Sequence, residues 1–194
     1  MDIILASTSP YRQQLLARLR LPFRCVAPGT DETRLAGEAP AAMARRLALA
    51  KAHSVAATHP HALVIGSDQV AAIDDTPMGK PGDHRTARAQ LGASSGREVY
   101  FHTAVAIACH ARQLERFHVE LFIAHFRRLE DRAIENYLRL EQPYDCAGSF
   151  KCEGLGIALF QRLEGRDPTS LEGLPLIALT SLLAGAGIDV LGIN

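Results

Sequence analysis

One aspartate in this chain lies where chemistry is expected. Asp68 follows the unbroken apolar run 62–65, which predicts a strand buried on both faces, and we expect Gly66 to let the chain turn at its end. The carboxyl edge of such strands is where ligands bind in open α/β sheets. A buried carboxylate needs a metal, a cation or several hydrogen-bond donors, so we predict Asp68 to be a general base or a metal ligand. An aspartate that caps a turn is the alternative.

The opening residues predict a strand, a tight turn and an exposed helix start. Apolar residues 3–6 precede three small hydroxyl residues, of which Ser9 suits an N-cap, and Pro10 suits the first helical position. The unpaired N–H groups at such a start bind phosphate well, and Ser7 lies beside them along the chain. Arg12 falls in the first turn, where contact with an anion would justify its positive charge. An ordinary capped helix that opens a βα unit explains the same pattern.

Three further charged residues are candidates for the same chemistry. Glu32 lies beside a second acid in a predicted loop, where the pair is either solvated or holds a divalent cation. Lys51 falls near the middle of a helix predicted over 41–58, a place where lysine is normally on the surface. Lys80 lies between a glycine and a proline, in a loop that suits phosphate contact or a solvent-exposed turn. This loop lacks the glycine spacing and the Ser or Thr of a Walker motif.

A second dense stretch lies at residues 145–156. It contains three glycines and few large side chains, so its backbone can approach another group closely. Glu153 stands between a cysteine and a glycine there.

The remaining pattern predicts the elements that must hold these residues. We expect strands at 23–26, 99–108, 116–126 and 157–160, with the middle two antiparallel, and helices at 83 to about 91, 129–140 and 174–184. Strands and helices mixed in this way indicate an α/β protein. Neither an internal repeat nor a Ser- or Pro-rich linker interrupts the chain, so we expect one domain over residues 1–194.

The composition narrows the classes of partner. The 47% hydrophobic fraction predicts a real core, and 21 basic residues balance 21 acidic ones. A general DNA or RNA binder would usually be basic, so no nucleic-acid partner is expected. The four cysteines form no CxxC pair, which is typical of reduced, mostly buried thiols. The chain begins with no signal-peptide pattern, and its most apolar segment, 174–188, is too short and broken to span a bilayer, so we expect a cytoplasmic protein away from membranes.

Taken together, these stretches resemble the Maf family of nucleoside triphosphate pyrophosphatases. The matching stretches keep the family's order nearly from end to end, at residues 5–12, 31–33, 51–52, 66–70, 79–81, 147–150 and 173–176. As a set they are highly specific, although no single one is. The resemblance implies an α/β fold of the Maf and ITPase-like type, with a long mixed sheet flanked by helices and two lobes around a central cleft. It also implies a divalent cation, hydrolysis of a nucleotide to its monophosphate and pyrophosphate, and a homodimer.

The resemblance extends to a subgroup. The common first motif has a second basic residue after its Ser-Pro pair, where this chain has Tyr11. An aromatic residue there, with Gln69 and Glu153, is similar to the bacterial YceF-type subgroup that hydrolyses 7-methyl-GTP, although tryptophan is the usual aromatic. A cationic methylated base gains about 0.5–2 kcal/mol from an aromatic face. A carboxylate such as Glu153 can accept from guanine N1–H and the exocyclic amine together, whereas a pyrimidine offers no such pair. A surface aromatic and a turn carboxylate are the alternatives.

The expected mechanism is attack of water on the α-phosphorus, with pyrophosphate leaving. Asp68 would be the base or a metal ligand, and Glu32 the second ligand of Mg²⁺ or Mn²⁺. Gln69 would contact the nucleobase or sugar. Phosphate oxygens would be held by four residues: Ser7, Arg12, Lys51 and Lys80. Two other functions stay open at this point: hydrolysis of dTTP and UTP, as in the sister subgroup, and nucleotide binding without turnover by a regulator of cell division or septum formation.

Overall fold

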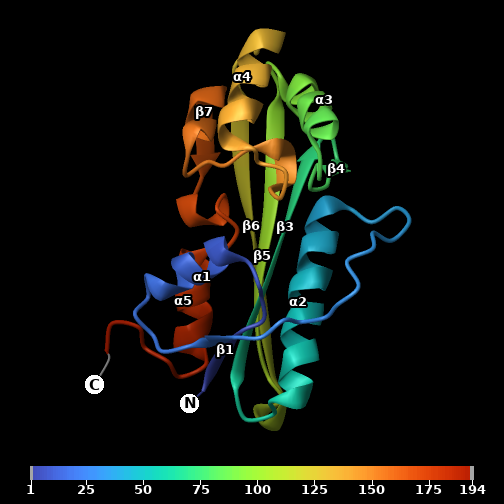
Figure 1. The fold of residues 1–194 in the computed structure, drawn as a ribbon. Coiled ribbons are helices and arrows are strands. Elements are labelled where there is room, and N and C mark those ends of the chain that lie inside the picture. The colour runs from blue at the N-terminus through green and yellow to red at the C-terminus, as the bar shows by residue number, and fades with distance from the viewer. Residues whose placement is uncertain (1, 193–194) are drawn as a thin grey trace.

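The computed structural model describes residues 2–192, which form a mixed β-sheet with helices on both faces (Figure 1). Within these residues the strands are β1 (Ile3–Leu5), β2 (Arg24–Cys25), β3 (Leu63–Ile73), β4 (Thr76–Met78), β5 (Glu98–Cys109), β6 (Leu114–Phe126) and β7 (Phe160–Gly165). The α-helices are α1 (Pro10–Ala17), α2 (Pro40–Thr58), α3 (His84–Ser94), α4 (Asp131–Glu141) and α5 (Leu176–Gly185).

The sheet is parallel at one side and antiparallel over the rest. Its strand order is β2-β1-β3-β5-β6-β7, and β4 pairs with β3 off this path. Strand β1 runs parallel to β2 and β3, whereas β3, β5, β6 and β7 pair antiparallel in turn. The long strands β3, β5 and β6 run most of the length of the molecule (Figure 1). This arrangement confirms the predicted α/β class, the mixed sheet and the antiparallel pairing of 99–108 with 116–126.

Three apolar clusters attach the helices to this sheet and divide the molecule into two lobes. In the lower lobe α1 and α5 pack on one face, with Leu179 buried, and α2 packs on the other, where Ala48 and Val64 belong to one cluster. The upper lobe consists of α3, α4, β7 and the segment 142–159, packed around Phe101 and Leu138. Both lobes therefore share the central strands as a common support.

The turn expected at Gly66 does not exist. Gly66 lies inside β3, which continues without a break to Ile73. A Cβ at this position would meet the carbonyl oxygen of Ala48 and would lie 2.7 Å from the nitrogen of Ala52, both in α2. The glycine thus allows a helix and a strand to touch, and Asp68 lies in the middle of a long strand rather than at its end.

Helix starts follow the predicted capping signals. The Ser9 side chain accepts from the backbone N–H of Arg12, and α1 begins at Pro10. The carboxylate of Asp83 accepts from the N–H of Thr86 at 2.7 Å, and α3 follows it. Capping side chains act over three residues, which is why the sequence alone locates these ends.

Two other expectations are wrong. The strand expected at 157–160 is a 3₁₀-helix over Leu155–Leu159, and β7 begins only at Phe160. Gly156 passes so close to the Lys151 carbonyl that no side chain would fit, so the chain is folded tightly where an extended strand was expected. Among the cysteines only Cys109 is buried, because Cys25 lies on the surface and the other two line a cleft. No helix within residues 2–192 has the length and apolar character needed to cross a membrane.

Candidate active site

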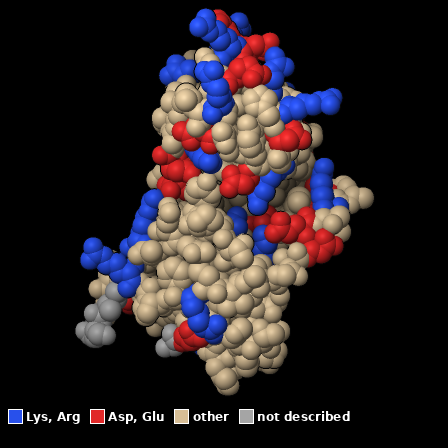
Figure 2. Space-filling model, in the orientation of Figure 1, with Lys and Arg blue, Asp and Glu red and all other residues tan. Residues whose placement is uncertain are grey.

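A cleft of about 890 Å³ lies between the two lobes. Its walls come from the start of α1, the middle of β3, one side of α2, the loop after β4 and the segment 145–153. Figure 2 shows acidic and basic side chains gathered at this hollow. All nine predicted site residues line the cleft: Ser7, Tyr11, Arg12, Glu32, Lys51, Asp68, Gln69, Lys80 and Glu153. The fold therefore brings together residues that are up to 146 positions apart (153 − 7).

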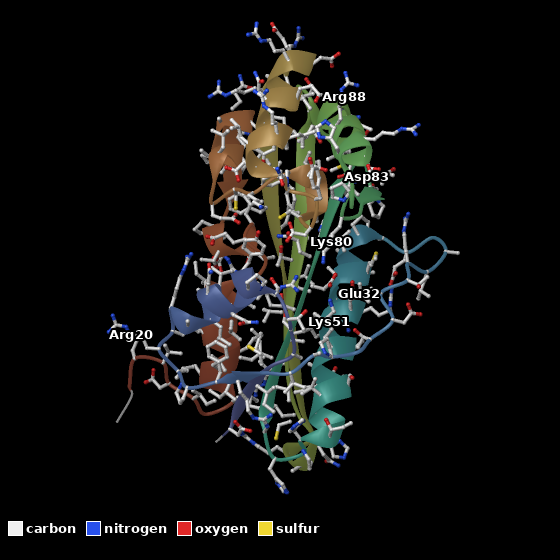
Figure 3. The ribbon with its side chains drawn as sticks, in the orientation of Figure 1. Arg20, Glu32, Lys51, Lys80, Asp83 and Arg88 are labelled. Atoms are coloured by element: carbon white, nitrogen blue, oxygen red, sulfur yellow. The ribbon has the colours of Figure 1, made fainter. Side chains whose placement is uncertain are left out.

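Lys51 connects two carboxylates of the cleft, those of Asp68 and Glu32. Its Nζ lies 2.6 Å from Asp68 Oδ1 and 2.6 Å from Glu32 Oε1. The Lys51 side chain is only 6% exposed, so the alternative of an ordinary surface lysine does not apply. Figure 3 shows Lys80, Glu32 and Lys51 one below another, from three separate segments, and all three line the cleft. The short contacts follow from Gly66, since Asp68 lies two residues along the same face of β3 and Lys51 directly precedes Ala52 in α2.

The two carboxylates differ in their electrostatic surroundings. Burial raises the pKa of Asp68, and the charges of Lys51 and Arg12 offset this only in part. Burial also acts to raise the pKa of Glu32, but the hydrogen bond and charge of Lys51 outweigh it and the net pKa is lowered. Glu32 has 57% of its side chain exposed, against 10% for Asp68, which explains the difference. Burial thus favours a proton on Asp68, whereas the neighbouring cations favour the ionised form of Glu32.

Arg12 is held in place by the loop before α5. Its Nε donates to the carbonyl oxygen of Gly173 at 2.8 Å, and Ser67 Oγ donates to the same oxygen at 2.9 Å. The guanidinium also experiences the charges of Asp68 and Glu32. The sequence reasoning missed Gly173 and Ser67 as supports, although a serine within an apolar strand was a signal for the second.

Gln69 also faces this loop. Its Nε2 donates to the carbonyl oxygens of Ser170 at 2.8 Å and Leu171 at 3.1 Å, and to Thr103 Oγ1 at 3.0 Å. The amide nitrogen is therefore committed to the protein, and a contact of Gln69 with substrate would have to use its oxygen. Ser7 is 5% exposed, and its Oγ accepts from the N–H of Ser9 at 3.1 Å.

Tyr11 and Glu153 lie with two cysteines at another part of the cleft. The phenol of Tyr11 is hydrogen-bonded to Cys146, and burial raises the pKa of Tyr11. Cys152 Sγ donates to Glu153 Oε2 at 3.4 Å. Burial and the neighbouring acids raise the pKa of both thiols to about 12, so both are protonated at neutral pH. These thiols are inert neighbours of an aromatic ring and a carboxylate.

The two carboxylates on Lys51 fit a divalent cation. Carboxylate oxygens are the ligands that Mg²⁺ and Mn²⁺ prefer, and Mg²⁺ is commonly bound by one or two carboxylates together with substrate phosphates and water. Asp68 and Glu32 both direct an oxygen at one positive group, the Lys51 ammonium. No group of three or more His, Cys, Asp or Glu suited to a metal occurs within residues 2–192. The chain would thus supply two ligands and leave the rest to substrate and solvent.

Comparisons with known proteins find similarity to the same family along nearly the whole chain. The family model described as "Maf-like protein" matches residues 2–186. A 7-methyl-GTP pyrophosphatase of Polaromonas sp. is 54% identical over 186 residues, which are 96% of this chain and 85% of that protein. The protein of that name from Thiobacillus denitrificans is 53% identical over 189 residues, 97% of this chain and 94% of that protein.

Solved structures share the fold at low identity. The Ham1 protein of Staphylococcus aureus aligns with a TM-score of 0.56 and 11% identity, over 96% of this chain and all of that one. A HAM1 protein from Coxiella burnetii gives 0.55 and 14%, over 95% and 99% of the two chains. At such identities the likeness concerns the fold alone, and it agrees with the predicted fold class.

Proposed function

The chain belongs to the Maf family, and from this premise we propose that it hydrolyses 7-methyl-GTP to 7-methyl-GMP and pyrophosphate. One observation carries the chemical part of the proposal. The two carboxylates of Asp68 and Glu32 meet at the Lys51 ammonium inside a cleft that Arg12 and Lys80 also line. Such a set of charges suits a polyphosphate, and the names of relatives more than 50% identical support the substrate.

The reaction requires little covalent chemistry from the protein itself. A water oxygen attacks the α-phosphorus, the bond from that phosphorus to the bridging oxygen breaks, and pyrophosphate leaves. Asp68 accepts the proton of the attacking water, a role that the raised pKa of its buried carboxyl favours. Asp68 and Glu32 would hold Mg²⁺ or Mn²⁺, which would neutralise charge on the phosphate oxygens.

The cations position the triphosphate. Arg12 is oriented by its bond to the Gly173 carbonyl and can donate its remaining N–H groups to phosphate oxygens. Lys51 would exchange part of its contact with the carboxylates for phosphate when substrate binds. Lys80 adds a positive charge to the cleft, and Ser7 adds a small polar side chain to its lining. Phosphoryl transfer gains mainly from such positioning and charge neutralisation.

Base recognition is assigned to Tyr11 and Glu153. The methylated guanine is cationic, so stacking on the Tyr11 ring stabilises it by about 0.5–2 kcal/mol. Glu153 accepts from guanine N1–H and the exocyclic amine, and its charge is opposite to that of the base. Tyr11 and Glu153 line the same cleft as Asp68 and Glu32, as this role requires.

The test is a pyrophosphate-release assay. 7-Methyl-GTP, GTP, dTTP and UTP are compared with Mg²⁺, with Mn²⁺ and with a chelator, using wild type and Asp68→Asn. The expected result is a metal-dependent release that is fastest with 7-methyl-GTP and nearly lost in the variant. Faster release from dTTP and UTP would instead indicate the sister activity, and tight binding without release from any nucleotide would indicate a regulator.

A further inference from the structure

The loop that carries Lys80 is packed at Pro81, which is buried, but the two residues before Pro81 have little packing of their own. Residues 79–82 connect β4 to α3, and Gly79 and Lys80 are both exposed. A Cβ placed on Gly79 would meet no atom within 4 Å. The position of Lys80 in the cleft therefore depends on hydrogen bonds to the backbone around it as well as on the buried Pro81 that follows it.

Gln90, a half-buried residue of α3 on the side that also carries the buried Ala87 and Ser94, supplies one of these bonds. Its Nε2 donates to the carbonyl oxygen of Gly79 at 3.0 Å. Its Oε1 accepts from Ser149 Oγ at 2.5 Å. The carbonyl of Gly79 can only accept, so it determines which end of the amide faces the loop. One side chain thus connects the residue before Lys80 to the segment 145–153, which also lines the cleft.

Ser149 anchors this connection firmly. It is fully buried and has a φ of 62°, a left-handed conformation that serine rarely adopts, and Gly148 before it has a φ of 76°. The same segment holds the Lys80 loop at a second point, where the N–H of Gly82 donates to the Tyr144 carbonyl at 2.9 Å. The loop is therefore connected to residues 144–149 on both sides of Lys80. Before Lys80 the connection runs from Gly79 through Gln90, and after it Gly82 bonds directly to Tyr144.

We propose that Gln90 is a positioning residue that keeps Lys80 directed into the cleft by holding the Gly79 carbonyl against Ser149. Lys80 is close enough to Glu32 for the two charges to interact, so this placement brings its ammonium to the region where phosphate would bind (Figure 3). The inference rests on the proposed function, since it assigns Gln90 a part in the same reaction. Gln90 acts through Lys80 and does not contact substrate.

A double-mutant cycle tests this role. Gln90→Leu keeps the volume of the side chain and removes both hydrogen bonds. We expect it to lower kcat/KM for 7-methyl-GTP by about fivefold to tenfold, the effect of one lost hydrogen bond. In a Lys80→Ala background the same change should cost less than about twofold, because the group that it positions is gone. Gln161→Leu, at an exposed glutamine of β7, is the matched control and should leave kcat/KM unchanged.

Two further variants separate positioning from loss of structure. Gln90→Glu can still accept from Ser149 but cannot donate to Gly79 when ionised, so it should lose activity as Gln90→Leu does. Ser149→Gly removes the hydroxyl and suits the left-handed backbone, so it should lower kcat/KM while the thermal midpoint stays or rises.

The outcomes are distinct for the inference and for the proposed function. Two results would overturn the inference alone, provided that Lys80→Ala still impairs hydrolysis. The first is an equal loss of kcat/KM from Gln90→Leu in the wild-type and Lys80→Ala backgrounds, and the second is no loss of kcat/KM in the wild-type background. Full activity of Lys80→Ala would overturn the inference and the phosphate-binding role of Lys80, because Lys80 would then have no role for Gln90 to support. Only the absence of 7-methyl-GTP hydrolysis by the wild type would overturn the proposed function.

Discussion

At the scale of single residues, the cleft is organised by a buried lysine. Lys51 lies between a buried and an exposed carboxylate, and it is the positive charge hydrogen-bonded to both. A buried charge is tolerated only when it is paired, so Lys51, Asp68 and Glu32 depend on one another. This dependence makes the protonation of Asp68 sensitive to its neighbour.

The first prediction concerns the pH dependence of hydrolysis. Asp68 acts in its ionised form, and its pKa is raised above the ordinary value of about 3.9, so kcat/KM should fall with decreasing pH at a higher pH than for an ordinary aspartate. Lys51→Met removes the main charge that lowers this pKa, so the acidic limb should move to still higher pH. The pH profiles of kcat/KM for both proteins measure this. An acidic limb that stays in place would contradict the assignment of Asp68 as base.

The second prediction concerns the nucleobase. Glu153→Gln keeps the shape of the side chain and removes its charge, so kcat/KM for 7-methyl-GTP should fall by roughly tenfold to a hundredfold, the worth of a charge-assisted hydrogen bond. The rate with UTP should change less than about twofold. Glu172→Gln is the matched control, since Glu172 lines the same cleft but pairs with Arg18 at 3.0 Å. Equal losses on both nucleotides for Glu153→Gln would remove it from base recognition.

At the scale of elements, the contact between β3 and α2 sets the geometry of the site. Gly66 lets the strand touch the helix backbone at Ala48 and Ala52, and this closeness allows the 2.6 Å contact of Lys51 with Asp68. The contact is made of backbone atoms, which cannot move aside as a flexible side chain would. Any side chain at Gly66 must separate the two elements.

The third prediction tests this contact. Gly66→Ala should destabilise the protein by about 2 kcal/mol or more through overpacking, and it should reduce hydrolysis because Lys51 and Asp68 move apart. Gly92→Ala is the control, since Gly92 lies in α3 with no atom within 4 Å of a Cβ and should gain up to about 1 kcal/mol in helix propensity. Chemical denaturation and the release assay measure both effects. Unchanged stability of Gly66→Ala would show that the contact relaxes freely.

At the scale of the whole molecule, stability and chemistry reside in different parts. Three apolar clusters secure the helices to the sheet, whereas the charged cleft lies between the lobes. The chain has no net charge, so the field that attracts a polyphosphate is local to the cleft rather than global. Loss of a cation from the cleft should therefore leave the fold intact.

The fourth prediction follows from this separation. Removal of divalent cations with a chelator should abolish hydrolysis, while the far-UV circular dichroism and the thermal midpoint without nucleotide change little. The two carboxylates remain compensated by Lys51 when no metal is present. Re-addition of Mg²⁺ or Mn²⁺ should restore activity at once. A large drop in the thermal midpoint on chelation would mean that a metal stabilises the fold itself.

Local patterns along the chain sufficed to predict much of this protein. Apolar runs located the long strands, Ser9 and Asp83 located helix starts, and the order of the motifs indicated the family and the residues of the cleft. The strands and the helix starts depend on hydrogen bonds and side-chain periodicity within a few residues, so a single sequence contains them. The family and the full set of cleft residues were instead implied by the resemblance of the motifs.

Other features were decided only by the tertiary structure. The burial of Lys51, the straight course of β3 through Gly66 and the link from Gln90 to the Lys80 loop each depend on contacts between segments far apart in the chain. A lysine is normally exposed, and a glycine after a strand often marks a turn. At Lys51 and Gly66 only the contact between α2 and β3 reverses these preferences. Residue types and order therefore determined which groups this protein has available, whereas the packing of α2, α3 and the 144–153 segment decided which of those groups meet.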